Sequence, residues 1–297
     1  MDIGELVRRH GGFVSRASLI QATDRRTVDA ALRSGAIVRV AQGRYALPVH
    51  DEARARAAAL NGVLCLTSAA VHHGWEVRTT PVAPHVLVPK NRRVTAERRA
   101  GTVLHRGILT PADIVDGIVT SKDLTLLQCL RRLPIPDALA VVDSALRHGE
   151  EATLERVVGR VRGAGRQQVL WLAQHARATA ANPFESATRA IALEVPGLSL
   201  EPQVVISSPR VWARPDLVDV GRRIVVECES FEWHGDRRGF RRDCRRYTLL
   251  VADGWSVVRF TWEDVMFRPD WVRRVLSDLV RLVDARTEVA WPSRRAA

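Results

Sequence analysis

Hydrophobic positions along the first 48 residues recur first with helical and then with strand spacing. Three consecutive amphipathic segments cover residues 2–12, 15–22 and 23–35. On the third segment Val28, Ala31 and Leu32 share one face, as expected for a helix that packs on a core. Strict alternation then predicts a hairpin over residues 37–47 that turns at Gln42-Gly43.

Three helices followed by a hairpin are the order of a winged helix-turn-helix domain, which we predict for residues 1–50. In such a domain the last helix lies in the major groove, where arginine binds phosphates or guanine edges. The side chains expected to face DNA are Arg25, Arg26, Thr27 and Arg33 on the helix, with Arg39 and Arg44 on the hairpin. Two alternatives stay open: an arginine-rich helix that is only solvated, and a winged helix that binds protein.

Residues 51–180 carry a mixed pattern that predicts an α/β middle region. One helix is expected over residues 53–75, short strands over residues 84–90 and 101–107, and further helices after residue 120. The adjacent histidines His72 and His73 would point in different directions on a helix, so we interpret them as structural residues. The pattern alone assigns no function to this region.

Residues 181–290 alternate in the order α-β-β-β-α-β-α. The first helix is expected to begin at Asn182 and Pro183 and to stop at Pro196-Gly197. Strands are predicted over residues 202–208, 212–220, 223–230 and 255–261, with a long basic helix over residues 235–254. The chain is therefore predicted to be an α+β multi-domain protein.

Composition narrows the classes of partner. The 297 residues have a formal net charge of +12, and Lys90 and Lys122 are the only lysines, so the excess is arginine. A charge this high favours a polyanion such as DNA, although a basic surface that binds nothing is the alternative. No apolar run is long enough to span a membrane or to act as a signal peptide, so a cytoplasmic location is expected. The four cysteines form no C-x-x-C pair and are expected to be free thiols.

Acidic residues stand at the ends of two predicted neighbouring strands. Asp216 lies eleven residues before Glu227, and Glu229 shares the face of Glu227 because side chains alternate along a strand. Mg²⁺ prefers oxygen ligands and acidifies a bound water for phosphodiester hydrolysis. We therefore predict that Asp216 and Glu227 hold Mg²⁺, for which Mn²⁺ can substitute. The alternative is a solvent-facing hairpin whose acids pair with Arg222 or Arg223.

The element order and these acids resemble the PD-(D/E)xK nuclease superfamily, in particular the very-short-patch-repair endonucleases. The residues that carry the resemblance are Glu185, Arg214-Pro215-Asp216, Glu227-Cys228-Glu229, Asp243, Arg246, Gly254, Trp255 and Arg259. The superfamily usually has lysine where this chain has Glu229. The resemblance implies a restriction-endonuclease-like domain in which Glu229 completes the metal shell or positions water and Glu185 supports it. His234 would be a general base, or else an exposed turn residue.

A basic stripe is predicted on the helix that follows the acids. Arginines at helical spacing along one face are Arg238, Arg241, Arg242, Arg245 and Arg246. Such a stripe beside a metal site would grip the DNA backbone. The alternative is a solvated helix whose arginines pair with Asp236 and Asp243.

The first half of the chain resembles antitoxins of the abortive-infection type IV class. Residues 1–48 resemble their winged helix, and residues 67–75, 84–90 and 103–133 resemble its companion region. The resemblance implies operator binding and autoregulation, and it leaves open whether a cognate toxin is a partner. Two functions thus stay open: a DNA-binding protein with a magnesium-dependent endonuclease domain, and an antitoxin-type transcriptional regulator whose nuclease fold is catalytically inert. The sequence does not indicate an oligomeric state.

Overall fold

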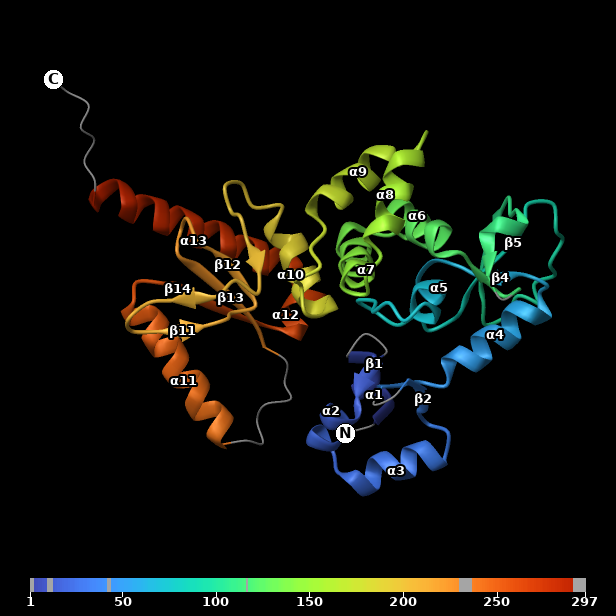
Figure 1. Ribbon diagram of the computed structural model, residues 1–297, viewed down its shortest axis with the longest axis horizontal. Helices are drawn as coiled ribbons and strands as arrows, with labels where there is room; N and C mark the ends of the chain where they lie inside the picture. Colours follow the sequence, from blue (N-terminus) through green and yellow to red (C-terminus); the bar gives the residue numbers. More distant parts are fainter. Residues whose placement is uncertain (1–2, 10–12, 42–43, 116, 230–236, 291–297) are drawn as a thin grey trace. The chain divides into compact units, whose positions relative to one another are not determined.

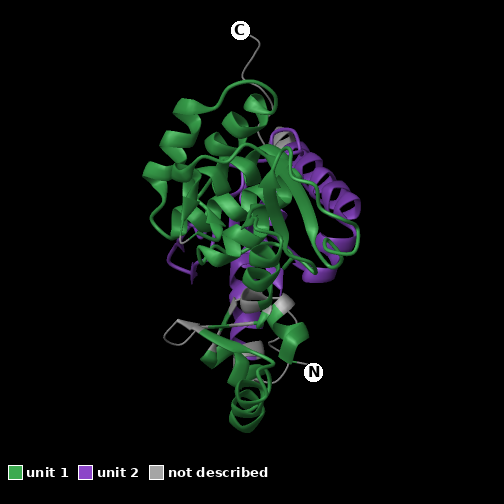
Figure 2. Cartoon of the chain, turned by 90° about the vertical axis from the view of Figure 1, so that its right-hand side faces the viewer, with its two compact units in different colours: residues 1–178 green, residues 179–297 purple. Residues whose placement is uncertain are grey.

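The chain is an α+β multi-domain protein, as its pattern predicts. The computed structural model describes residues 3–9, 13–41, 44–115, 117–229 and 237–290. Two compact units cover residues 1–178 and 179–297, and each contains helices and sheet (Figure 2). The finer division into segments 1–50, 51–180 and 181–290 stays a prediction.

The N-terminal segment packs three helices on a small antiparallel sheet (Figure 1). Its elements are α1 (Ile3–Arg9), β1 (Phe13–Ser15), α2 (Arg16–Ala22), α3 (Arg25–Arg33), β2 (Val38–Ala41) and β3 (Arg44–Ala46). The strand order is β1-β3-β2. The sequence pattern did not predict β1, because three residues are too short to show an alternation. Ser15, the first residue of the helical segment predicted over residues 15–22, is instead the last residue of β1 and pairs with Arg44.

Helix α3 is fixed at its start by a side chain and along its length by the core. Asp24 is its N-cap, and its Oδ1 accepts a hydrogen bond from the backbone N–H of Thr27 at 2.8 Å. Val28 is fully buried, and it shares one hydrophobic cluster with Leu19 and Ile37. The polar face of α3 is thereby turned to solvent.

The helix expected over residues 53–75 is wrong, because a strand interrupts it. The observed elements are α4 (Val49–Ala59), β4 (Val63–Leu64) and α5 (Leu66–His72). Asn61 adopts a positive φ of 45°, which ends the helical path. A Cβ at Gly62 would lie 2.7 Å from the Val86 side chain and 2.8 Å from the Leu87 carbonyl oxygen, so only glycine lets the chain pass this neighbouring strand.

Strand β4 is central in a mixed five-stranded sheet. The other strands are β5 (His85–Pro89), β6 (Val103–Gly107), β7 (Ile114–Val115) and β8 (Val119–Thr120), in the order β6-β5-β4-β8-β7. β5 pairs parallel with β6, and β4 pairs parallel with β8. Leu64, Val86 and Val119 belong to the buried cluster of this sheet. A short 3-10 turn, η1 (Pro111–Asp113), precedes β7.

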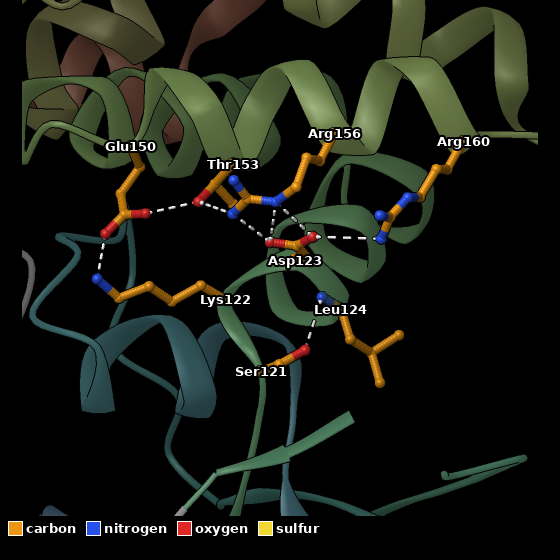
Figure 3. Close-up of polar contacts among 8 residues, drawn as sticks. All are labelled: Ser121, Lys122, Asp123, Leu124, Glu150, Thr153, Arg156 and Arg160. Atoms are coloured by element: carbon orange, nitrogen blue, oxygen red, sulfur yellow. Dashed lines mark hydrogen bonds and ion pairs between the residues drawn. The ribbon is translucent and has the colours of Figure 1, made fainter. Parts of the chain in front are cut away.

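Four helices follow this sheet and are joined by charged contacts. They are α6 (Lys122–Arg132), α7 (Ile135–Arg147), α8 (Glu151–Arg160) and α9 (Arg166–His175). At the start of α6, Asp123 accepts hydrogen bonds from Arg156 Nε at 2.9 Å and Nη2 at 2.8 Å (Figure 3). Glu150 pairs with Lys122 and accepts a hydrogen bond from Thr153 Oγ1 at 2.6 Å (Figure 3). These contacts tie α8 to the first turn of α6.

Two histidines on neighbouring strands are stacked. His85 Nδ1 lies 3.0 Å from His105 Nε2, and the two rings are nearly parallel, with an interplanar angle of 13°. One ring must donate and the other accept, so the contact requires at least one neutral histidine. Burial, together with the neighbouring His105, lowers the pKa of His85 to about 4. Burial and the charge of Arg132 also lower the pKa of His105.

This pair predicts an acid-sensitive first unit. Because the pKa of His85 is lower in the folded chain than in the unfolded chain, where it is near 6.5, its contribution is fully present above pH 6.5 and is lost as the pH falls towards 4. We expect the free energy of unfolding to decrease by about 1–2 kcal/mol over this interval, allowing for partial exposure of the ring. Urea unfolding of the wild type and of His85→Asn across this range measures it. An equal pH slope in both proteins would contradict the prediction.

The second unit is a four-stranded sheet between helices (Figure 1). Its elements are α10 (Pro183–Ala192), β9 (Glu201–Pro202), β10 (Ile206–Ser207), β11 (Trp212–Ala213), β12 (Leu217–Asp219), β13 (Ile224–Glu229), α11 (Arg237–Ala252), β14 (Ser256–Thr261), α12 (Trp262–Phe267) and α13 (Pro269–Ala290). The strand order is β14-β13-β12-β9, and β10 and β11 form a separate two-stranded sheet. Ile224 and Val226 pack with α10 and α13, whereas Val225 packs with Leu250 of α11. The helices therefore cover opposite faces of the sheet.

Two predicted strands are each split in two. The strand over residues 202–208 breaks after Pro202, where Gln203 has a positive φ of 60°. The strand over residues 212–220 breaks between Ala213 and Leu217, because Pro215 has no N–H to donate to a ladder. The expected order α-β-β-β-α-β-α thus gains short strands. The two halves of each split strand belong to different sheets.

Two expectations drawn from composition can be compared with the described residues. In the part of the chain that the structure describes, no helix is long and apolar enough to cross a membrane. The cysteines Cys65, Cys129, Cys228 and Cys244 are free thiols, as expected.

Candidate functional site

The outward face of α3 carries the arginines that the sequence singles out. Arg25, Arg26 and Arg33 are exposed. Arg33 Nε donates to the Asp29 carbonyl at 3.3 Å, which directs that side chain along the helix. Arg25 and Arg26 stand in the first turn, where the helix N-terminus favours anions. This end of α3 is therefore suited to bind phosphate.

Thr27 has a structural task that the sequence analysis did not assign to it. Its hydroxyl donates to Asp24 Oδ2 at 2.6 Å, and its backbone N–H donates to Oδ1. These hydrogen bonds from Thr27 lower the pKa of Asp24, which stays ionised as the cap. We expect Thr27 to hold the start of α3 in place, so its proposed contact with DNA competes with this role.

The hairpin is fixed against α3 by Arg16. This side chain pairs with Asp29 of α3 and donates to the hydroxyl of Tyr45 in β3 at 3.3 Å. Arg39 lies exposed on β2. Arg44 lies on β3, and its side chain is outside the described residues, as is the turn at Gln42-Gly43. The backbone thus places both hairpin arginines on the sheet that Arg16 ties to α3.

In the second unit the predicted acid pair comes together. Leu217 pairs with Val226 across antiparallel β12 and β13, which brings Asp216 opposite Glu227. Asp216 Oδ2 accepts a hydrogen bond from the backbone N–H of Cys228 at 2.8 Å. Glu227 is 3% exposed. The two carboxyl groups share the sheet face that α11 covers.

Burial and mutual repulsion control the charge of this pair. Burial, followed by the charge of Asp216, raises the pKa of Glu227. Burial also raises the pKa of Asp216, against the hydrogen bond from Cys228. Two carboxylates this close cannot both ionise easily, so the pair holds a proton more strongly than either group would alone.

Arg246 of α11 supplies a positive charge beside the pair. Its Nη2 lies 3.3 Å from Glu227 Oε1 and 3.5 Å from Asp243 Oδ1, and it donates to the Tyr247 hydroxyl at 2.9 Å. The approach to Glu227 is close enough for an ion pair, yet Glu227 Oε1 has no hydrogen-bond donor, since the geometry is unsuitable. We interpret the contact as electrostatic.

Glu229 is engaged at the edge of the same face. Its Oε1 accepts hydrogen bonds from the Tyr247 hydroxyl at 2.6 Å and from Arg259 Nε at 2.8 Å. Burial acts to raise the pKa of Glu229, but these two hydrogen bonds outweigh it and the pKa is lowered. The Tyr247 ring also contacts both guanidinium groups, at 4.9 Å from Arg246 and 4.5 Å from Arg259. Nothing in the sequence pattern identified Tyr247, because an isolated tyrosine on a basic helix has no motif spacing.

Glu185 is buried and closes the start of α10. Its carboxylate accepts hydrogen bonds from the Ala181 N–H at 2.9 Å, Asn182 Nδ2 at 3.0 Å and Gln203 Nε2 at 3.1 Å. Asn182 is the N-cap, as predicted. Gln203 Nε2 also approaches Asp216 Oδ1 at 3.4 Å and so links the two carboxylates. No motif in the sequence identifies Gln203, because its position depends on the break between β9 and β10.

The arginines of α11 divide into two groups. Arg241, Arg242 and Arg245 are exposed and available to a polyanion, whereas Arg246 turns inward to the acids. The side chain of Arg238 and the whole of His234 lie outside the described residues.

The alternative prediction, in which the acids pair with Arg222 or Arg223, is wrong. Arg222 pairs with Asp284 at 3.0 Å and Arg223 pairs with Asp253 at 3.5 Å.

These residues fit a divalent cation poorly. The Glu185 carboxylate accepts hydrogen bonds from three donors, and one Glu229 oxygen accepts two. Arg246 lies beside Glu227 Oε1. Within the described ranges no group of three or more His, Cys, Asp or Glu side chains is arranged to hold a metal ion. We therefore derive no reaction step through Mg²⁺.

Comparison with known proteins identifies relatives of this chain. Residues 62–174 match the model of the AbiEi antitoxin C-terminal domain. The chain is 30% identical over 257 residues to two Mycobacterium tuberculosis proteins, the uncharacterized proteins MT2308 (strain CDC 1551 / Oshkosh) and Rv2248 (strain H37Rv). Each alignment covers 82% of this chain and 93% of the relative. The crystal structure of RV2827C protein from Mycobacterium tuberculosis is similar with a TM-score of 0.31 and 17% identity, over 70% of this chain and 87% of that one, which is too low to establish a shared fold.

Proposed function

Because the chain belongs to the family of the mycobacterial proteins MT2308 and Rv2248 and has an AbiEi antitoxin C-terminal domain at residues 62–174, we propose that it is a DNA-binding regulator of antitoxin type. The match to the antitoxin domain carries this proposal. It favours regulation over hydrolysis, because the match covers the middle of the chain and says nothing of a nuclease.

We further propose that residues 1–48 are a winged helix that docks α3 in the major groove. Three features support this: the order of helices and strands, the exposed pair Arg25 and Arg26 at the start of α3, and the Arg16 contacts that tie the hairpin to that helix. Arg33, Arg39 and Arg44 would add contacts along the groove. In this proposal Thr27 acts mainly through its hydrogen bonds to Asp24.

The proposal predicts control of the chain's own promoter. Expression of the full chain should repress a reporter placed behind the DNA upstream of its coding sequence, because antitoxins of this class regulate themselves. Reporter activity with and without the chain measures this. Equal activity would contradict the regulatory function.

A cognate toxin is the proposed protein partner, as the antitoxin family implies. The gene next to this one is the candidate, and a nucleotidyltransferase-like product there would favour the proposal. Co-purification of that product with the full chain tests the partnership. Failure of the two proteins to associate would restrict the proposal to DNA binding.

For the second unit we propose a PD-(D/E)xK-like fold that serves as a scaffold and does not cut DNA. Support comes from the internal contacts of Glu185, Glu229 and Arg246, which take up oxygens that a metal would need. Hydrolysis at Asp216, Glu227 and Glu229, with His234 as base, stays an untested prediction of the nuclease resemblance. The exposed arginines of α11 would then contribute to DNA binding alone.

Plasmid nicking separates the scaffold from the hydrolase. With 10-fold excess protein and Mg²⁺ or Mn²⁺, we expect the wild type, Asp216→Ala and Glu227→Ala to leave supercoiled plasmid equally intact, because no cation is held at the acids. The assay follows conversion to open circles over hours. If the wild type cuts the plasmid and both substitutions abolish the cutting, the scaffold proposal is wrong and the nuclease function is supported.

A further inference from the structure

The acid pair on β12 and β13 lies against a fixed internal cation. Glu227 is 3% exposed, and Arg246 Nη2 lies 3.3 Å from its Oε1. A second arginine of this face, Arg259, donates to Glu229 at 2.8 Å. The Arg246 guanidinium thus occupies the space beside Glu227 Oε1.

We infer that the Arg246 guanidinium takes the place of a divalent cation beside Glu227 and keeps this site free of metal. The inference deepens the proposed scaffold function of the second unit and rests on it. It also gives a physical reason for the proposed lack of hydrolysis, which the sequence resemblance does not contain.

Charge is the first argument. Arginine stays protonated at every physiological pH, so its charge cannot be removed to admit a metal. A doubly charged ion within a few ångströms of it would be repelled, and partial burial weakens the screening by water. Arg246 in its observed position therefore opposes the binding of Mg²⁺ at Glu227.

Packing is the second argument, because Arg246 is held in position. It contacts Asp243 at 3.5 Å, donates to the Tyr247 hydroxyl at 2.9 Å and lies 4.9 Å from the centre of the Tyr247 ring. The Arg259 guanidinium also contacts the Tyr247 ring, 4.5 Å from its centre. Displacement of Arg246 would break these contacts together, so it does not behave as a free surface side chain.

Unmet hydrogen-bonding capacity is the third argument, and it predicts what happens when Arg246 is removed. Glu227 Oε1 and Arg246 Nε are buried without hydrogen-bond partners. Without the guanidinium, the Glu227 oxygen would face Asp216 with no cation beside it. A divalent cation that displaces the proton shared by the two carboxyl groups can take these oxygens as ligands. Substitution of Arg246 should therefore create a metal site that the wild type lacks.

Mn²⁺ titration of the full chain, followed by the electron paramagnetic resonance signal of free Mn²⁺, tests this inference. We expect no saturable binding to the wild type up to about 1 mM, the range of weak protein sites. Arg246→Met should bind one Mn²⁺ per chain with a dissociation constant at least about tenfold below this 1 mM limit. The double variant Arg246→Met/Glu227→Gln should lose that site. Arg245→Met is the matched control, because Arg245 is the exposed neighbour, and it should behave as the wild type does.

Three results would overturn the inference. One is stoichiometric Mn²⁺ binding to the wild type that Glu227→Gln removes. The second is a folded Arg246→Met protein that binds no Mn²⁺, with folding checked by circular dichroism; Arg246→Gln replaces it if Met does not fold. The third is tight binding to Arg246→Lys, which retains the positive charge and should exclude the ion. DNA binding is measured separately, so failure here leaves the regulatory proposal standing.

Discussion

Arg25→Ala/Arg26→Ala is expected to weaken binding to promoter DNA by about tenfold to a hundredfold at moderate salt. Both side chains are exposed in the first turn of α3, where the helix N-terminus adds to their attraction for phosphate. Loss of two phosphate contacts should also reduce the slope of log affinity against log salt by about two. The fold should be unchanged, because neither side chain belongs to the core.

Gel shifts across a salt series measure both quantities. Arg268→Ala/Arg274→Ala is the matched control, since it removes the same charge from exposed positions around α13 in the second unit. The control should lose little affinity. A similar loss in both double variants would mean that net charge alone matters and would reject the placement of α3 in the groove.

Leu19→Ala is expected to destabilise the N-terminal segment by about 2–5 kcal/mol and to reduce DNA binding with it. Leu19 is fully buried in α2 and shares one cluster with Val28 of α3 and Tyr45 of β3. Its truncation leaves a cavity between α3 and the hairpin, the two elements proposed to contact DNA. A small domain has only about 5–15 kcal/mol in total, so this is a large fraction.

Thermal unfolding and gel shifts on the same preparations test this prediction. Ile20→Ala is the comparison, because Ile20 is the next residue on α2 and is only partly buried. It should cost clearly less. Equal stabilities for the two variants, or full DNA binding by Leu19→Ala, would show that this core does not hold the recognition surface.

The sequence predicted the helices of this chain better than its short strands. Helix α3 was predictable because Asp24 caps it and Val28 and Ala31 repeat at helical spacing. Strand β4 was not, because its two residues follow a helix-like run and depend on the contact of Gly62 with β5. The breaks at Gln203 and Pro215 likewise depend on which strand each half meets.

The candidate site was predictable in its acids and not in their partners. Alternation along β13 put Glu227 and Glu229 on one face, and the strand pairing placed Asp216 opposite Glu227. The direction of Arg246 could not be derived, because the helical stripe treats Arg245 and Arg246 alike, while only the second is turned towards the sheet. Spacing gives the face of a helix, but the neighbouring element decides which residue is buried.

In the second unit, the acids Glu227 and Glu229 therefore lie against internal cations. Arg246 faces Glu227, and Arg259 and Tyr247 bind Glu229. An active hydrolase would need these oxygens for a metal and water. The contacts of the residues that carry the nuclease resemblance are thus those expected of the proposed scaffold, and residues 62–174 match the AbiEi antitoxin C-terminal domain model.

Specific binding of the full chain to the DNA upstream of its own coding sequence tests the central claim most directly. At physiological salt, in competition with a scrambled sequence of equal length, we predict a preference of at least about a thousandfold for the native sequence, together with a defined DNase footprint. Equal affinity for the two sequences, with no footprint, would contradict a regulator that reads DNA through its N-terminal segment.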